Sequence, residues 1–169
     1  MALILLRIAR RSATLEERDL QTIVETEFWH EGRPDLRLSV YNIRNDATDI
    51  VRAYTGHSAS VPNLDAPFRS RHHFDVSGLE PRPVVVVPIA TGFEFLSAAH
   101  REIPFENDTE LRRFVEQLRD EFPRRQRHVS KQDAEGYVKQ RLLESDSEWL
   151  ALRAKGGEWG NYLGKLTRR

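Results

Sequence analysis

Two adjacent histidines and an aspartate are the residues that most obviously suggest metal chemistry. His72 and His73 stand just before Asp75 in FRSRHHFDVSG, residues 68–78. Imidazole nitrogens and carboxylate oxygens bind zinc, but a zinc site needs three or four such ligands. Neighbouring side chains of an extended segment point in opposite directions, so only one histidine can readily join Asp75. Because no ligand spacing such as H-E-x-x-H accompanies the pair, we favour a polar loop anchored by its phenylalanines over a metal site.

A second candidate chemistry is the binding of a phosphate-bearing ligand. The loops at residues 10–14, 42–46 and 88–92 each follow an expected strand and precede an expected helix. If the strands are parallel, these loops meet at one edge of the sheet, where helix N-termini and arginines favour an anion. The candidate ligand-binding residues are Arg10, Arg11, Arg44, Asn45, Asp46, Thr91 and Gly92. In the alternative interpretation the polar residues only cap helices, since the chain has no glycine-rich phosphate motif.

The most basic stretch, PRRQRHVSK at residues 123–131, is a candidate nucleic-acid surface. It contains no acidic residue, and its cations are Arg124, Arg125, Arg127 and Lys131. Binding of single-stranded nucleic acid also uses aromatic side chains for stacking. The nearby aromatics Phe114 and Phe122 fall on the apolar face of an expected helix instead. An exposed turn between helices is therefore the favoured interpretation.

Aromatic residues near the C-terminus are candidates for binding a partner protein. These are Trp149, Trp159 and Tyr162, the last two in the glycine-rich segment GGEWGNYLG. Tryptophan and tyrosine are enriched where protein interfaces are strongest. The same residues could equally dock on the chain's own sheet, and the sequence leaves both possibilities open.

Hydrophobic periodicity predicts the elements that must position these residues. Strands are expected at 2–8, 36–43 and 83–90, and the four valines of the last predict a central strand covered on both faces. A helix is expected after each of the first two strands, and others at 107–122, 130–144 and 146–155. Residues 93–103 fit both a helix and a strand, and the capping-box spacing of Thr91 and Glu94 favours a helix.

This order of elements predicts an α/β fold with a small, mostly parallel sheet of three to four strands covered by helices. The fourth strand would lie near HHFDV. We expect an α/β domain at residues 1–125 and a helical C-terminal extension at 126–169, packed on that domain or on a partner. The alternative is an antiparallel α+β sandwich in which residues 93–103 form a strand.

Composition excludes several classes of function. The 26 basic and 26 acidic side chains cancel, so no overall field draws the protein to nucleic acid or to an anionic membrane. The chain has no cysteine, which removes disulfides, thiolate nucleophiles and cysteine-ligated metals. Its apolar runs are too short for a membrane span, so we expect a soluble cytoplasmic protein without a membrane partner.

The sequence therefore favours a non-enzymatic interaction or regulatory domain that uses its helical, aromatic C-terminal region. Its partner would be another protein or a second copy of the chain, and no cofactor is expected. No catalytic motif is assembled: the serines, for example, lack the G-x-S-x-G context that exposes a nucleophile. The first alternative is a small phosphate-ligand-binding protein, with or without hydrolytic chemistry, and the second is a nucleic-acid-binding protein.

Overall fold

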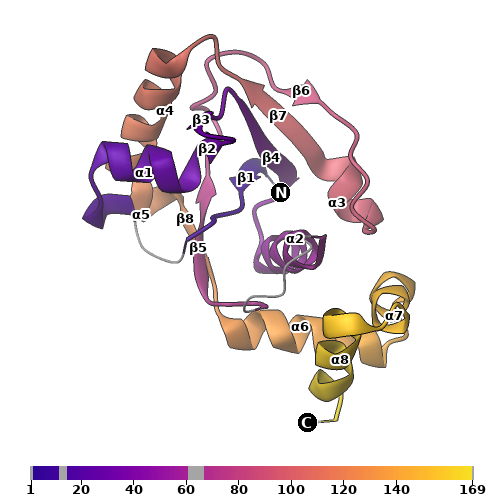
Figure 1. Cartoon of the computed structure of the whole chain (residues 1–169). Coiled ribbons are helices and arrows are strands. Elements are labelled where there is room, and N and C mark those ends of the chain that lie inside the picture. Colours follow the sequence, from indigo (N-terminus) through magenta and orange to yellow (C-terminus); the bar gives the residue numbers. More distant parts are fainter. Residues whose placement is uncertain (1, 12–14, 61–66, 169) are drawn as a thin grey trace.

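The computed structural model describes residues 2–11, 15–60 and 67–168, and a six-stranded sheet lies at its centre (Figure 1). Its strands, in spatial order, are β6 (Val85–Val86), β7 (His100–Pro104), β4 (Arg37–Arg44), β1 (Leu3–Arg7), β5 (Arg71–Asp75) and β8 (Gln126–Val129). Every neighbouring pair is antiparallel. The prediction of a mostly parallel α/β sheet is therefore wrong, and the alternative antiparallel α+β fold is confirmed.

The connection between β1 and β4 explains why these strands are antiparallel. After β1 the chain forms a short 3₁₀ turn, η1 (Leu15–Glu17), and helix α1 (Leu20–Glu27). A small hairpin, β2 (Trp29–His30) and β3 (Arg33–Pro34), then turns the chain back. The chain thus re-enters the sheet at the end where β1 leaves it, which places Leu6 opposite Tyr41. A parallel neighbour would instead need a crossover that returns to the other end of β1.

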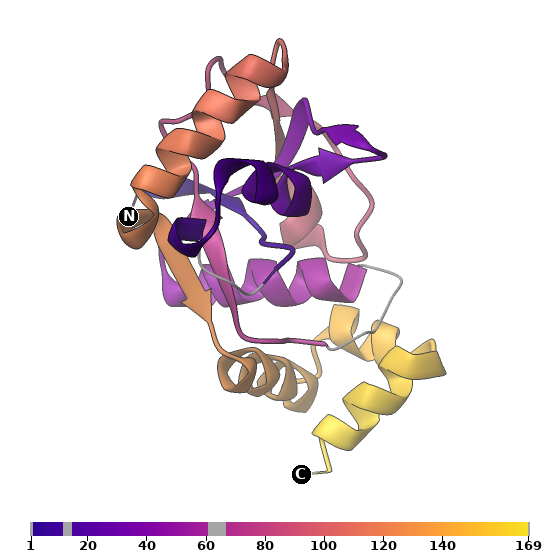
Figure 2. The same ribbon diagram turned by 60° about the vertical axis from the view of Figure 1, so that its left-hand side comes forward.

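Helices cover both faces of the sheet. On one face lie α1, α4 (Asp108–Asp120) and the short α5 (Phe122–Arg125). On the other face α2 (Ala47–Ser60) and α3 (Glu94–Ala99) pack against the sheet. Helices α6 (Lys131–Leu143), α7 (Ser147–Ala154) and α8 (Gly157–Leu166) form an outer layer beyond α2 (Figure 2). A hydrophobic core lies on each face of the sheet, and strand β1 contributes to both. Leu5 packs on the side of α1 and α4, and Leu6 packs on the side of α2.

The four-valine run does not form the predicted central strand. Only Val85 and Val86 are in a strand, and that strand is β6 at the edge of the sheet. Both residues are exposed, Val85 at 42% and Val86 at 65% of their surfaces. The flanking Pro83 and Pro88 lack N–H groups, and proline is confined to the ends and edges of sheets for that reason.

The ambiguous segment 93–103 contains both of its predicted structures. Helix α3 covers Glu94–Ala99, and strand β7 begins at the next residue, His100. The fourth strand predicted near HHFDV is confirmed as β5. Strand β8 was not predicted at all, and it places residues 126–129 within the sheet, next to β5.

An aromatic cluster fastens the outer helices to the rest of the protein. The ring of Phe68 lies 6.3 Å from that of Trp149, 5.5 Å from Trp159 and 5.8 Å from Tyr162, between ring centroids. Trp149 is buried, and Leu163 of α8 is fully buried in the same core. The C-terminal aromatics therefore pack against Phe68 within the chain, with Trp159 and Tyr162 half-buried.

Candidate functional site

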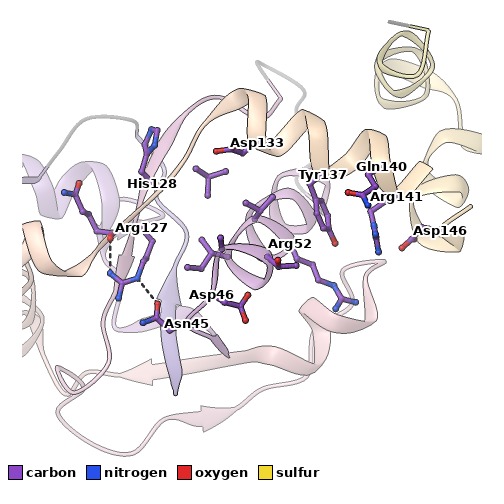
Figure 3. Close-up of a pocket in the computed structure, with 16 residues that line it drawn as sticks. Asn45, Asp46, Arg52, Arg127, His128, Asp133, Tyr137, Gln140, Arg141 and Asp146 are labelled. Carbon is purple, nitrogen blue, oxygen red and sulfur yellow. Dashed lines mark hydrogen bonds between the residues drawn. The ribbon is translucent and has the colours of Figure 1, made fainter. Parts of the chain in front are cut away.

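A groove of about 960 Å³ lies between the N-terminal half of α2, strand β8 and helix α6 (Figure 3). Its walls mix apolar residues of α2 and β8 with charged and amide side chains. The lining residues are 45–48 and 50–52 at the start of α2, 126–129 in β8, and Asp133, Tyr137, Gln140, Arg141 and Asp146. The groove thus joins three elements that are distant in the sequence.

Strand β8 brings an unpaired edge to this groove. The strand ends the sheet on this side and pairs with β5 alone, with His128 opposite His72 and Arg127 opposite His73. All four residues of β8 line the groove. In an antiparallel strand every second backbone N–H and C=O points away from the existing neighbour. Within the described chain, these outward groups of β8 have no strand to bind.

One end of the groove is built around Arg127. Its Nε donates to Oδ1 of Asn45 at 3.0 Å, and its Nη2 lies 3.1 Å from Oδ2 of Asp75. Asp46 caps helix α2 by accepting from the backbone N–H of Asp49 at 2.8 Å. The Arg127 charge is therefore balanced by Asp75 within the protein.

The other end of the groove holds Arg52, whose guanidinium carbon lies 4.1 Å from the centre of the Phe95 ring. Arg52 is exposed, and none of the described carboxylates forms an ion pair with it. Tyr137 and Arg141 lie close by (Figure 3), and partial burial raises the pKa of Tyr137. Arg141 forms an ion pair with Glu144, so Arg52 is the groove cation whose charge is not balanced by the described residues.

Acidic residues are also present in the groove. Asp146 accepts from the backbone N–H groups of Glu148 and Trp149 at the start of α7, whereas Asp133, in the first turn of α6, is exposed and has no cation partner among the described residues. Three arginines and three aspartates line the groove in total. The lining therefore carries charges of both signs.

The predicted phosphate-binding residues are not gathered at one edge. Because β1 and β4 are antiparallel, Arg10 lies beyond the C-terminal end of β1, whereas Arg44, at the C-terminal end of β4, lies beside the N-terminal end of β1. The backbone N–H groups of Arg10 and Arg11 already bind an anion, the buried carboxylate of Glu27, at 2.7 and 3.0 Å. Residues 12–14 of that loop lie outside the described residues.

Thr91 and Gly92 of the same prediction shape the turn before α3. The Thr91 hydroxyl accepts from the backbone N–H of Phe93 at 3.1 Å, and Gly92 has a φ of 81°, which glycine adopts readily. Of the predicted phosphate-binding residues, Asn45 and Asp46 line the groove described above.

The histidine pair is divided between the two faces of β5. His73 is buried, and its Nδ1 accepts from the backbone N–H of Ala9 at 3.1 Å. His72 points to the opposite face, where its ring lies 4.6 Å from that of His128. Asp75 binds Ser77 and Arg127. Among the described residues, no group of three or more histidine or carboxylate side chains is placed to hold a metal ion.

The cations of the basic stretch are held by partners within the protein. Arg125 is buried and donates to the carbonyls of Asp75 and Ser77, at 3.1 and 2.8 Å. Arg124 pairs with Glu121 at 3.1 Å, and Lys131 with Glu135 at 3.8 Å. Of the four predicted nucleic-acid residues, Arg127 lines the groove.

A further polar cluster is buried between α2 and the sheet. The hydroxyl of Tyr41 lies 2.9 Å from Nδ1 of His57, and the Tyr41 ring lies 5.7 Å from that of His100. Burial lowers the pKa of His57 to about 4 and raises that of Tyr41 to about 12. Both groups are therefore neutral at physiological pH, and their packing is that of a polar core.

Sequence reasoning missed Arg52, Tyr137 and Arg141. They are surface residues of α2 and α6, and nothing in the local pattern links the two helices. A prediction of strand β8 would have linked the two helices, because β8 leads directly into α6.

Comparisons with known proteins add no relative. No protein-family model matches the chain, and searches of curated proteins and of solved structures find no match either. In the described part of the chain, no helix combines the length and the apolar character needed to cross a bilayer.

Proposed function

We propose that this chain is a non-catalytic interaction domain that binds an extended segment of a partner protein along β8. The observation that carries this proposal is the coincidence of an unpaired strand edge with the groove, since every residue of β8 lines it. An extended peptide that pairs with such an edge gains main-chain hydrogen bonds, and neighbouring pockets read its side chains.

The charges of the groove support a peptide over a phosphate compound. Arg52 has an unbalanced positive charge at one end, and Asp133 has an unbalanced negative charge beside β8. A peptide can place an acidic side chain near the first and a basic side chain near the second, whereas a phosphate group would complement Arg52 alone and leave Asp133 without a counter-charge. Arginine and tyrosine, both present here, are enriched among residues that dominate binding energy.

The test is a selection of peptides from a displayed random library against the full chain. We expect selected peptides to share an acidic and a basic position, and Arg52→Glu to weaken their binding at least about tenfold. Ala47→Trp should block the groove, because Ala47 is an exposed lining residue at the start of α2. Ala151→Trp, at an exposed position of α7 outside the groove, is the matched control and should bind as the wild type does.

Amide hydrogen exchange distinguishes strand addition from binding by side chains alone. A peptide paired with β8 should slow the exchange of every second amide within Gln126–Val129, because only alternate N–H groups point outward. Peptides that bind Ala47→Trp as tightly as the wild type, or that leave all β8 amides unchanged, would contradict the proposal. Displacement of the peptides by inorganic phosphate or a nucleotide would favour the phosphate-ligand alternative instead.

A further inference from the structure

Arg52 is held by an aromatic ring and not by a carboxylate of the described chain. Its guanidinium carbon lies over the ring of Phe95, 4.1 Å from the ring centre. An N–H group inserted between them would hold the carbon farther away, so this separation indicates contact through the flat face of the guanidinium. Such a contact is attractive, because the face of an aromatic ring is electron-rich. The N–H donors of arginine lie in the plane of the guanidinium, so they stay free to bind a carboxylate through two parallel hydrogen bonds.

The position of the Phe95 ring is fixed by its surroundings. Phe95 lies in α3 and is half-buried, packed against the core on the α2 side. Its neighbours tie α3 to α7: the backbone N–H of Glu94 donates to Oε2 of Glu148 at 2.6 Å, and the Phe93 ring lies 4.8 Å from that of Trp149. The ring is therefore part of the folded core, and the guanidinium has a fixed surface to lie on.

The charges around Arg52 suit a ligand group with a single negative charge. Arg141, the other cation at this end of the groove, pairs with Glu144, and Asp146 adds a carboxylate to the same wall (Figure 3). A carboxylate of the ligand would match the one free charge of Arg52. A phosphoryl group carries nearly two negative charges at neutral pH, and the second would lie near Asp146 without a cation.

We propose that Arg52 and Phe95 together bind the carboxylate of an aspartate or glutamate side chain in the partner segment, with Phe95 as the positioning residue. This proposal rests on the proposed function, because it names the group that the positive end of the groove recognises. A lysine at position 52 would keep the charge, but it could neither lie flat on the ring nor bind a carboxylate through two parallel N–H groups. The pair therefore recognises the planar carboxylate and not charge alone.

A double-mutant cycle on a selected peptide tests the role of Phe95. The peptide carries glutamate at its acidic position, and a second peptide carries glutamine there. Phe95→Leu should weaken the glutamate peptide about threefold more than the glutamine peptide, and Phe95→Tyr should retain the preference for glutamate. Arg52→Lys should lose most of that preference. Phe105→Leu, in the core on the other face of the sheet, is the matched control and should leave the preference unchanged.

An equal loss for both peptides in Phe95→Leu would show that the ring only supports the fold, and it would overturn the proposal. A phosphoserine peptide that binds more tightly than the glutamate peptide would overturn the assignment of a carboxylate.

NMR of the free protein separates this proposal from the proposed function. Nuclei above an aromatic ring resonate upfield, so Phe95→Leu should move the Nε–H resonance of Arg52 downfield and Phe95→Tyr should not. Sodium acetate should also move this resonance, whereas sodium chloride at the same ionic strength should not. Failure of either response overturns the proposal even if peptides bind along β8. Both responses without any selected peptide would support the carboxylate site and contradict the binding of a segment along β8.

Discussion

Replacing Phe68 separates the contribution of its ring from the cost of its backbone conformation. The ring is 1% exposed and contacts both tryptophans of the outer helices, so Phe68→Ala should lower the free energy of unfolding by about 3–5 kcal/mol. Phe68 also has a φ of 57°, a left-handed conformation that costs a residue with a side chain about 1–2 kcal/mol and glycine almost nothing. Phe68→Gly should therefore be more stable than Phe68→Ala by about 1 kcal/mol.

Urea unfolding followed by tryptophan fluorescence measures both differences, because Trp149 and Trp159 lie beside the substituted ring. Phe114 is the matched control: it is buried too, but it lies inside helix α4. There the order should reverse, with glycine less stable than alanine by about 1 kcal/mol, because glycine is the poorer helix former. An alanine variant at Phe68 that equals or exceeds the glycine variant in stability would refute the role assigned to the backbone. A loss below about 1 kcal/mol for Phe68→Ala would refute the role assigned to the ring.

Three further predictions concern the buried polar groups and the last helix. Glu27→Ala should cost about 1–3 kcal/mol in urea unfolding, because it removes the fully buried carboxylate that accepts from the backbone N–H groups of Arg10 and Arg11, whereas the exposed Glu25→Ala should change stability by less than about 0.5 kcal/mol. Gly160→Ala should lower the melting temperature, because its Cβ would lie 2.9 Å from a backbone oxygen of α7, while Gly164→Ala should raise it, because its Cβ meets open space and alanine favours the helix. Burial lowers the pKa of His73 to about 3, so the unfolded chain takes up a proton below about pH 6.5 that the folded protein refuses. His73 should thus leave stability unchanged above that pH and lower it on acidification by about 1.4 kcal/mol per pH unit. Urea titrations of His73→Gln should show a slope smaller by that amount, and the slope that remains includes the contribution of His57, whose pKa burial also lowers.

The helices that sequence reasoning located well are those specified by local signals. The helices expected at 107–122 and 130–144 occur as α4 and α6, and they begin after Asn107 and Ser130, whose side chains accept from backbone N–H groups three residues on. A cap and an amphipathic stripe are contained within a few turns of chain, so they can be read without knowledge of the rest.

Strand direction depends on contacts that no local pattern contains. Alternation of strands and helices suggested a parallel sheet, but the Trp29–Pro34 hairpin after α1 returns the chain to the end where β1 leaves the sheet. The position of PVVVVP was readable in part, because a proline at each end is typical of an edge. The run of four valines indicates a buried central strand instead, and that prediction is wrong.

The candidate site was divided in the sequence between two unrelated hypotheses. Asn45 and Asp46 belonged to a phosphate site and Arg127 to a nucleic-acid surface, yet the three line one groove. They meet because β8 adds to the sheet beside β5 and leads into α6, which packs on α2. Asn45 and Arg127 are 82 residues apart in the sequence, so only the fold reveals that they are neighbours.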